Sequence, residues 1–375
     1  MSITVCLSAD TIGYTEGGGH LWAYLNWALG LRALDCQVIW LEGISPSIPV
    51  HKVQANLAAL KSHLERYDLA KCLALCSRTG EPLHGEATGD CLDIDAAAEA
   101  DLLLNLRYGM RSNVVSRFRR SALIDIDPGL LQIWMSKGQI RVAQHDVYFT
   151  IGETVGQPGA RFPDTGIKWQ YTPPCVTLNR WPLHQAPASA PFTTVSHWHA
   201  DEWMENENGS YPNDKRAGFL PFLDLPQRTA QPLELALCLA DDDEDERMAL
   251  QERGWRVRDA YAVASTPWDY QHYIQNSRGE FSCAKPSCMY LENAWISDRT
   301  LCYLASGKPA VVQYTGPSRF LPDAAGLFRF RVLEEAARYL EMAAADYERQ
   351  CGLARALAQE YFDARKVVGR VLELT

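Results

Sequence analysis

Short apolar runs alternate along the chain with longer segments whose apolar residues recur at helical spacing. The first run, Ile3–Leu7, is followed by His20–Leu34, which has the helical pattern, and then by a second run, Gln37–Leu41. Strands that are apolar throughout and separated by helices are typical of a parallel sheet covered on both faces. The pattern therefore predicts an α/β fold.

The alternation continues on both sides of a proline-rich segment, Thr172–Pro191, which suits a linker because proline interrupts regular structure. Further elements are predicted as strands at Leu102–Leu106, Ala122–Ile126, Asp146–Thr150, Phe192–Ser196, Leu233–Leu237 and Pro309–Gln313, and as a helix at Val53–Tyr67. From Val332 onward most residues are helix formers. We expect two doubly wound, Rossmann-like domains, 1–178 and 192–358, then a helical segment, 359–375.

The composition limits the partners of the protein. A net charge of -10 argues against broad binding to nucleic acid or an anionic membrane surface, because both favour basic patches. No apolar run approaches the roughly 20 residues of a membrane span, and the first residues lack the pattern of a signal peptide. The 11 cysteines form no CxxC pair, and His197 and His199 have no further ligand at metal-binding spacing. We expect a cytoplasmic protein without a metal site, nucleic-acid partner or membrane span.

The segment GYTEGGGH, Gly13–His20, places three adjacent glycines between the first strand and the first helix. Gly17, Gly18 and Gly19 do not complete the dinucleotide fingerprint, because Trp22 stands where its third glycine belongs. The lysine-serine ending of a P-loop is also missing. Glycines still let the backbone approach a ligand, and the following helix N-terminus favours an anion. A plain tight turn is the alternative.

A second polar segment, Asn276–Gly316, precedes and includes a predicted helix, Arg299–Ser306. Either Ser297 or Asp298 is a suitable N-cap for that helix. We expect the charged and hydroxyl residues ahead of it to crowd one loop, namely Arg278, Glu280, Ser282 and Lys285. A helix N-terminus beside such side chains suits a diphosphate, because N–H groups and cations neutralise its charge.

Two stretches resemble a known family. SDRTLCYLASGKPAVVQYTG, Ser297–Gly316, resembles the donor-nucleotide region of GT-B fold glycosyltransferases, in which a helix is followed by A-x-G-x-P-V-V. GGGHLWAYLNWALGLRALDCQVIWLEG, Gly17–Gly43, is similar to the first strand–loop–helix–strand unit of that family. The resemblance covers both ends of the chain and the two-domain plan, and the order and spacing of the motifs make it moderately specific.

The resemblance implies two Rossmann-like domains facing across a cleft, with the nucleotide sugar bound mainly by the second and the acceptor by the first. It also implies that the last helix crosses back onto the first domain, and that neither a metal nor a cofactor beyond the donor is needed. By the same resemblance Gly17, Gly18 and Gly19 face the diphosphate. The implied donor-site residues are Arg278, Glu280, Ser282, Lys285, Ser297, Asp298 and Arg299.

One departure from the family pattern concerns stereochemistry. Retaining members often carry a ribose-binding glutamate five residues before the glycine of A-x-G, where this chain has Cys302. Asp298, one helical turn earlier, is an alternative partner for the ribose. The stretch RGEFS, Arg278–Ser282, is similar to the arginine–glutamate loop of protein-arginine rhamnosyltransferases, an inverting GT-B group that uses dTDP-rhamnose. We therefore expect inversion.

An inverting transfer requires a carboxylate or histidine that takes the proton of the acceptor. Glu16 and His20 flank the three glycines and are two candidates. Asp127 is the third, because it follows the strand Ala122–Ile126 in the sequence IDIDPG. Aspartate before proline-glycine is also common in turns, so a structural role for Asp127 is the alternative.

The sequence therefore predicts a hexosyl- or deoxyhexosyltransferase that moves a sugar from a UDP- or dTDP-linked donor to an acceptor without a metal. Two alternatives remain. A nucleotide-sugar epimerase of the same fold would bind the same nucleotide but need no acceptor. A non-catalytic homologue would bind a nucleotide sugar without turnover.

Overall fold

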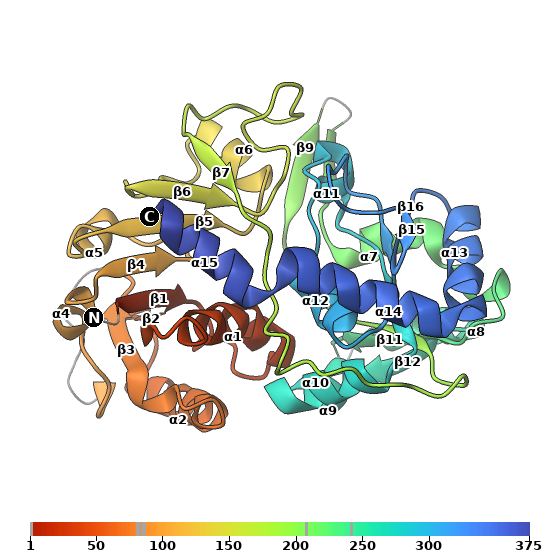
Figure 1. The fold of residues 1–375 in the computed structure, drawn as a ribbon, viewed down its shortest axis with the longest axis horizontal. Coiled ribbons are helices and arrows are strands. Elements are labelled where there is room, and N and C mark those ends of the chain that lie inside the picture. Colours follow the sequence, from red (N-terminus) through yellow and green to blue (C-terminus); the bar gives the residue numbers. More distant parts are fainter. Residues whose placement is uncertain (1–2, 80–82, 84–87, 207–208, 241–242) are drawn as a thin grey trace. The chain divides into compact units, whose positions relative to one another are not determined.

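The computed structural model describes residues 3–375 except 80–82, 84–87, 207–208 and 241–242 (Figure 1). The chain divides into two compact units. Unit 1 comprises Met1–Pro158, Phe162–Thr177 and Asp363–Thr375, and unit 2 comprises Gly159–Arg161 and Leu178–Phe362. The chain thus returns to unit 1 after completing unit 2.

Unit 1 contains a seven-stranded sheet in the order β3-β2-β1-β4-β5-β6-β7, and all of its neighbouring strands are parallel. The strands are β1 (Thr4–Ala9), β2 (Gln37–Ile44), β3 (Leu73–Ser77), β4 (Leu102–Asn105), β5 (Ser121–Asp125), β6 (Val147–Thr150) and β7 (Trp169–Tyr171). The order reverses between β1 and β4, and ligands of such sheets bind beyond the carboxyl ends of the strands near this point. We call that side of each sheet its carboxyl edge.

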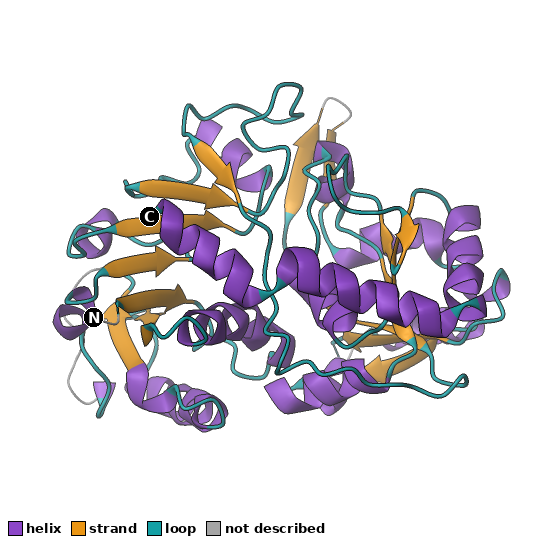
Figure 2. Ribbon diagram, in the orientation of Figure 1, coloured by secondary structure: helices purple, strands orange, loops and turns teal. Residues whose placement is uncertain are grey.

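Helices flank the unit 1 sheet (Figure 2). They are α1 (Gly18–Arg32), α2 (Val50–Glu65), α4 (Ile94–Ala98), α5 (Ser112–Val115), α6 (Leu130–Ser136) and α15 (Ala364–Leu374), with a 3₁₀ turn at Ala70–Cys72. The last helix, α15, packs on α1. A Cβ atom at Gly30 would lie 2.9 Å from Val368 and 3.0 Å from Ala364, so glycine permits this close approach. Asp363 also forms a bridge with Val176 at the end of the unit 1 chain segment.

The unit 2 sheet has the order β12-β11-β8-β13-β14-β16-β15, which matches unit 1 over the first five strands and then places β16 before the antiparallel edge strand β15. Its strands are β8 (Phe192–His197), β11 (Leu233–Cys238), β12 (Arg256–Asp259), β13 (Gly279–Ser282), β14 (Ala310–Gln313), β15 (Ala324–Ala325) and β16 (Leu327–Phe330). A separate hairpin joins β9 (Trp203–Asn206) to β10 (Gly209–Pro212). The reversal of order lies between β8 and β13.

The helices of unit 2 enclose an aromatic core in which the Phe281 and Phe330 rings stack with centroids 5.3 Å apart. They are α7 (Lys215–Phe219), α8 (Glu244–Glu252), α9 (Ala260–Ala264), α10 (Pro267–Asn276), α11 (Pro286–Leu291), α12 (Asp298–Ala305), α13 (Leu333–Ala345) and α14 (Tyr347–Leu357), with 3₁₀ turns at Leu220–Phe222 and Leu225–Gln227 and a π-helical turn at Ala358–Phe362. The proline-rich linker is tied to this unit by Arg355 of α14, which donates hydrogen bonds to the carbonyls of Trp181 and Leu178.

The α/β class and two Rossmann-like units predicted from the sequence are confirmed, and each predicted strand overlaps an observed strand, with ends that differ by at most three residues. The prediction of a loop across Arg278–Lys285 was wrong, because Gly279–Ser282 forms the buried strand β13 beside the point where the order reverses. Its sequence, GEFS, has one large apolar residue, so no apolar run marks it as a strand. Among the described residues no helix is long and apolar enough to cross a membrane.

Candidate functional site

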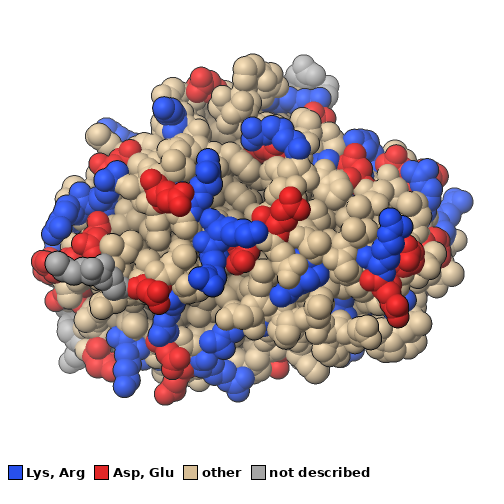
Figure 3. Space-filling model, viewed as in Figure 1, with Lys and Arg blue, Asp and Glu red and all other residues tan. Residues whose placement is uncertain are grey.

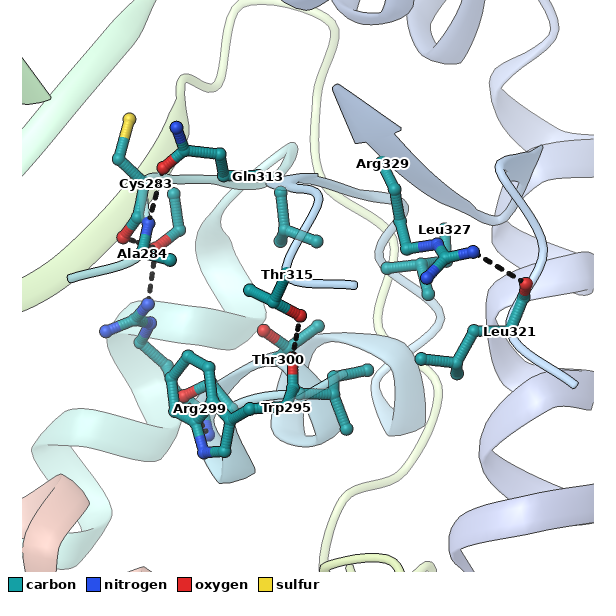
Figure 4. A pocket seen from close by; sticks show the side chains of 14 residues that line it. Cys283, Ala284, Trp295, Arg299, Thr300, Gln313, Thr315, Leu321, Leu327 and Arg329 are labelled. Atoms are coloured by element: carbon teal, nitrogen blue, oxygen red, sulfur yellow. Dashed lines mark hydrogen bonds between the residues drawn. The ribbon is translucent and has the colours of Figure 1, made fainter. Parts of the chain in front are cut away.

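A pocket lies at the carboxyl edge of the unit 2 sheet, where β13 and β14 end and α12 begins (Figure 4). Gln313 at the end of β14 accepts a hydrogen bond of 3.0 Å from the Ala284 amide. Arg299 and Thr300 enter from the first turn of α12. The remaining lining residues are Ser282, Cys283, Trp295, Ile296, Ser297, Val312, Thr315, Leu321, Leu327 and Arg329.

Arg299 organises one wall of this pocket. Its Nε lies 2.8 Å from Glu280 Oε1, and its remaining nitrogens donate to Ser282 Oγ at 2.5 Å and the Val195 carbonyl at 2.9 Å. Burial acts to lower the pKa of Arg299, but Glu280, Tyr270 and Tyr303 together outweigh burial and raise that pKa. Glu280 is completely buried, and its Oε2 has no hydrogen-bond partner among the described residues. The structure therefore brings three predicted donor-site residues together as a buried ion pair with one unused acceptor.

Ser297 and Asp298 lie at the start of α12. The Ser297 hydroxyl accepts a hydrogen bond from the Arg299 amide at 3.3 Å, and so Ser297 is the N-cap that the sequence offered as one of two choices. Asp298 is the first helical residue. A carboxylate there offsets the positive end of the helix dipole and adds negative charge beside any bound anion.

Lys215 is a cation of this site that the sequence analysis missed. It is the first residue of α7, after the N-cap Asp214. Lys215 Nζ donates to the Cys283 carbonyl at 2.5 Å and lies 5.8 Å from the centre of the Trp295 ring. Burial, together with the positive charge of Arg299, lowers the pKa of Lys215 to about 7. The only sequence signal was an aspartate suited to an N-cap, Asp214, followed by Lys215-Arg216, about 80 residues before the motif that begins at Ser297.

The loop that carries Trp295 into the pocket wall is held in a strained backbone conformation. Glu292 and Ala294 both have left-handed backbone angles, with φ of 46° and 57°. A Cβ atom at Gly316 would lie 2.6 Å from the Glu292 carbonyl oxygen, so glycine is required opposite the loop. Thr315 Oγ1 donates to the Trp295 carbonyl at 2.5 Å. Such strain persists where surrounding contacts determine the backbone, and it is frequent at ligand sites.

Lys285 lies beyond β13 and anchors the hairpin, with its Nζ 2.6 Å from Glu202 Oε2. Arg278 does not join the cluster. It precedes β13, and at about 3.3 Å per residue its Cα is roughly 13 Å from that of Ser282. Its guanidinium lies 3.2 Å from the centre of the Tyr347 ring and donates to the Ala186 carbonyl at 3.2 Å. The prediction that Arg278 and Lys285 share one loop was wrong, because the strand β13 separates them.

In unit 1 the residues just before the glycine-rich loop surround a carboxylate of the chain itself. Glu42 of β2 is completely buried and accepts hydrogen bonds from the amides of Thr11 at 3.0 Å and Ile12 at 3.2 Å. It also accepts from the Thr11 hydroxyl and, at 2.9 Å, from Trp40 Nε1. Burial raises the pKa of Glu42 although these hydrogen bonds act to lower it. The amides just before the loop are therefore already occupied by an internal anion.

The three glycines lie at the start of α1. Gly17 is the N-cap and Gly18 the first helical residue, and both are buried, whereas Gly19 is half-buried. A Cβ atom at Gly17 would lie 2.2 Å from the Tyr14 ring, so tight packing alone accounts for that glycine. The proposed contact of Gly17, Gly18 and Gly19 with a diphosphate stays a prediction.

The three candidate bases lie in different surroundings. Glu16 is exposed. His20 is half-buried between Tyr14 and Tyr24, and its Nε2 is 2.8 Å from the Asp10 carbonyl oxygen. Because a carbonyl can only accept, Nε2 carries the proton and Nδ1 is the basic nitrogen.

Asp127 accepts a hydrogen bond of 3.0 Å from the Tyr108 hydroxyl. Its amide donates at 2.9 Å to Asp125, which is completely buried and also accepts from Gln132 and Thr150. Burial and then the negative charge of Asp127 raise the pKa of Asp125 to about 7. Two neighbouring carboxyl groups with different surroundings thus lie where β5 ends.

No protein-family model matches the chain, and no curated protein sequence is similar to it. Solved structures do resemble it over its whole length. An alpha-glucosyltransferase in complex with UDP is 10% identical, with a TM-score of 0.62, and the match covers 100% of this chain and 99% of that one. Sucrose-phosphate synthase from Thermosynechococcus elongatus is 11% identical, with a TM-score of 0.57 and coverage of 99% and 98%. Anabaena Alr3699/HepE in complex with UDP-glucose is 12% identical, with a TM-score of 0.57 and complete coverage of both chains. The chain therefore has the fold of GT-B glycosyltransferases, as the sequence predicted.

Proposed function

We propose that the protein is a glycosyltransferase that uses a UDP- or dTDP-linked sugar, and that the donor binds at the carboxyl edge of unit 2. The observation that carries this proposal is the buried Glu280–Arg299 pair at the N-terminus of α12, with Lys215 beside it. A helix N-terminus and two cations suit a diphosphate. Solved structures of the same fold that contain UDP or UDP-glucose support this assignment.

In the proposed reaction, an acceptor oxygen or nitrogen attacks the anomeric carbon while the bond from that carbon to the diphosphate oxygen breaks. The electron pair of the broken bond leaves with the nucleoside diphosphate, and the acceptor's proton passes to a base of unit 1. Lys215 and the N-terminus of α12 stabilise the negative charge of the departing diphosphate, without a metal. A hexosyl or deoxyhexosyl group is transferred with inversion.

Among the candidate bases the geometry favours His20. Its Nε2–H is fixed by the Asp10 carbonyl, which leaves Nδ1 oriented and able to accept a proton. Asp127 already accepts a hydrogen bond from Tyr108, and Glu16 is exposed without an orienting partner among the described residues. Substituting each in turn, as His20→Gln, Asp127→Asn and Glu16→Gln, should lower kcat most for His20→Gln.

The experiment that tests the donor site compares thermal shifts with UDP, dTDP, GDP, ADP and NAD. A ligand at 100 times its Kd stabilises the folded protein by about 2.7 kcal/mol, so UDP or dTDP should raise the Tm clearly. Lys215→Met should abolish this shift, and Lys52→Met, an exposed lysine of α2, should leave it unchanged. No shift with either nucleotide, or an equal shift in Lys215→Met, contradicts the proposal.

Turnover separates the remaining alternatives. Incubation with UDP-glucose or dTDP-rhamnose and a panel of acceptors should release the nucleoside diphosphate, and the anomeric configuration of the product, read by NMR, tests inversion. Conversion of the sugar donor by the protein alone into its epimer would instead identify an epimerase. Binding without any turnover would identify a non-catalytic protein.

A further inference from the structure

Two arginines meet at the carboxyl edge of unit 1, next to the point where its strand order reverses. Arg78 directly follows β3, and Arg107 lies two residues after β4. Arg78 pairs closely with Asp10 Oδ1, and Arg107 Nε lies 3.9 Å from Asp10 Oδ2. Two guanidinium groups therefore share one carboxylate, and the cluster keeps a net positive charge.

The chain makes specific room for Arg107. A Cβ atom at Gly43 of β2 would lie 1.7 Å from the Arg107 Nη1 atom, so any other residue there would displace the guanidinium. Arg78 contacts the same glycine, because its Nε donates to the Gly43 carbonyl at 3.0 Å. Gly43 thus sets the positions of both cations relative to each other.

The backbone of Arg107 is fixed as well. The backbone N–H of Arg107 donates to Asn105 Oδ1 at 2.9 Å. The side-chain nitrogen of Asn105, Nδ2, lies 3.0 Å from His145 Nε2. His145 Nδ1 is 2.8 Å from the Ala143 carbonyl, so Nδ1 carries the proton and Nε2 accepts from Asn105. These contacts hold the turn that presents Arg107.

The Arg107 guanidinium nevertheless has no hydrogen-bond acceptor in the part of the chain that the structure describes. Its Asp10 contact at 3.9 Å is too long for a hydrogen bond, although the side chain is only 13% exposed. A guanidinium carries five donors in a planar fork that fits two oxygens of a carboxylate or phosphate. A positioned and largely buried fork without an acceptor is therefore suited to an external oxyanion.

We propose that Arg107, assisted by Arg78, binds a phosphate or carboxylate group of the acceptor, so that the acceptor of the proposed glycosyl transfer is an anionic molecule. The proposal rests on the proposed function for the identity of that ligand. Asp10 links the site to the favoured base, because its carboxylate contacts the two arginines while its carbonyl orients His20. An acceptor held by this fork would have its nucleophile within reach of His20.

The test is titration of inorganic phosphate into the full-length protein by calorimetry, with UDP already at saturation so that the donor site is filled. Phosphate should bind the wild type, and Arg107→Gln should weaken binding at least tenfold. Arg117→Gln, which removes an exposed arginine paired with Asp95, is the matched control and should bind as wild type does. Arg107→Lys keeps the charge without the fork and should bind weakly.

Equal phosphate binding by wild type and Arg107→Gln, or no binding by the wild type, overturns the proposal. Competition between UDP and phosphate at the Arg107 site would assign this oxyanion to the donor and also overturns it. Gly43→Ala provides a second variant that keeps both arginines but displaces the guanidinium, and it should likewise lose phosphate. UDP binding by Arg107→Gln is measured in parallel, because failure of UDP to bind any variant would contradict the proposed function rather than this site.

Discussion

The two sheets share their strand order over five strands, but their carboxyl edges bury different sets of charged groups. Unit 1 buries the carboxyl groups of Glu42 and Asp125 among hydrogen-bond donors, whereas unit 2 buries the Glu280 carboxylate against Arg299, with Lys215 beside the pair. Strand order decides where a ligand site lies in such folds, and the buried charge decides what the site can bind or do. A cationic edge suits a diphosphate leaving group, and an edge with carboxyl groups and a histidine suits proton transfer.

The two edges also stabilise their charges differently. Glu42 is surrounded by hydrogen-bond donors from a loop and an indole, and no cation pairs with it among the described residues. Arg299 is neutralised by Glu280, a carboxylate that is itself completely buried. On the visible face of the molecule, in contrast, basic and acidic side chains are intermixed, as Figure 3 shows. Neither sign of charge dominates the face that Figure 3 shows.

Breaking the unit 2 pair should have the largest effect. Arg299→Ala leaves Glu280 buried without a counter-charge, which should lower the free energy of unfolding by about 3–5 kcal/mol. Urea denaturation measures this loss. The double variant Arg299→Met, Glu280→Gln removes both charges and should be clearly more stable than Arg299→Ala. A loss below about 1 kcal/mol in the single variant would show that the pair is not buried as described.

Removing the internal anion of unit 1 should cost somewhat less. Glu42→Leu leaves the amides of Thr11 and Ile12 and the indole of Trp40 without their acceptor, for an expected loss of about 3 kcal/mol. The free energy of opening measured by hydrogen exchange at the Thr11 and Ile12 amides should fall by a similar amount. Glu65→Leu, at an exposed position of α2, is the control. Unchanged exchange at both amides would mean that Glu42 does not hold the loop.

The charge of Lys215 should make UDP binding depend on pH. With a pKa of about 7 in the free protein, Lys215 is protonated below that pH and mostly neutral above it. UDP needs the cation, so its Kd should rise above about pH 7, by at most about tenfold per pH unit. Calorimetry in buffers of different ionisation enthalpy should detect proton uptake on binding. A wild-type Kd that is flat between pH 6 and 9 would refute the assignment.

The smallest expected effect concerns His145, which supports the turn of Arg107 in its neutral form. Burial lowers the pKa of His145 below the ordinary histidine value of about 6.5. Because the pKa of His145 is lower in the folded than in the unfolded protein, the neutral side chain contributes its full stabilisation above the unfolded pKa of about 6.5. This contribution to the free energy of unfolding is lost as the pH falls below that value. The difference in unfolding free energy between wild type and His145→Gln should therefore shrink from pH 7.5 to pH 5. If the difference in unfolding free energy instead grows from pH 7.5 to pH 5, the pKa of His145 is raised rather than lowered by folding.

The apolar pattern predicts the frame of both units because central parallel strands are buried on both faces and read as continuous runs. It misses β13, whose GEFS sequence places a glutamate where the pattern expects an apolar residue. That glutamate is present because it pairs with Arg299, 19 residues later, and one-dimensional spacing does not reveal this contact. One of the strands that the sequence did not predict is therefore a strand of the candidate site.

Other site features depend equally on distant pairs. The recognised motif supplied Arg299 and the helix cap, but Lys215 begins the short helix α7 after the β9–β10 hairpin, in a segment that carries no motif. The need for glycine at position 43 exists only because Arg107 lies beside it. Local sequence also cannot show that Glu42 occupies the amides just before the glycine-rich loop, since the two segments are about 30 residues apart.

The return of α15 to unit 1 has a consequence for synthesis. The face of α1 around Gly30 is covered by Ala364 and Val368, which are translated only after the whole of unit 2. At about 5–20 residues per second, the roughly 185 residues of Leu178–Phe362 take about 10–40 s to make. During that interval the nascent first unit exposes an apolar helical face on the ribosome. Unit 2 needs no residue after Phe362. It can therefore finish folding before unit 1, although most of it is synthesised later.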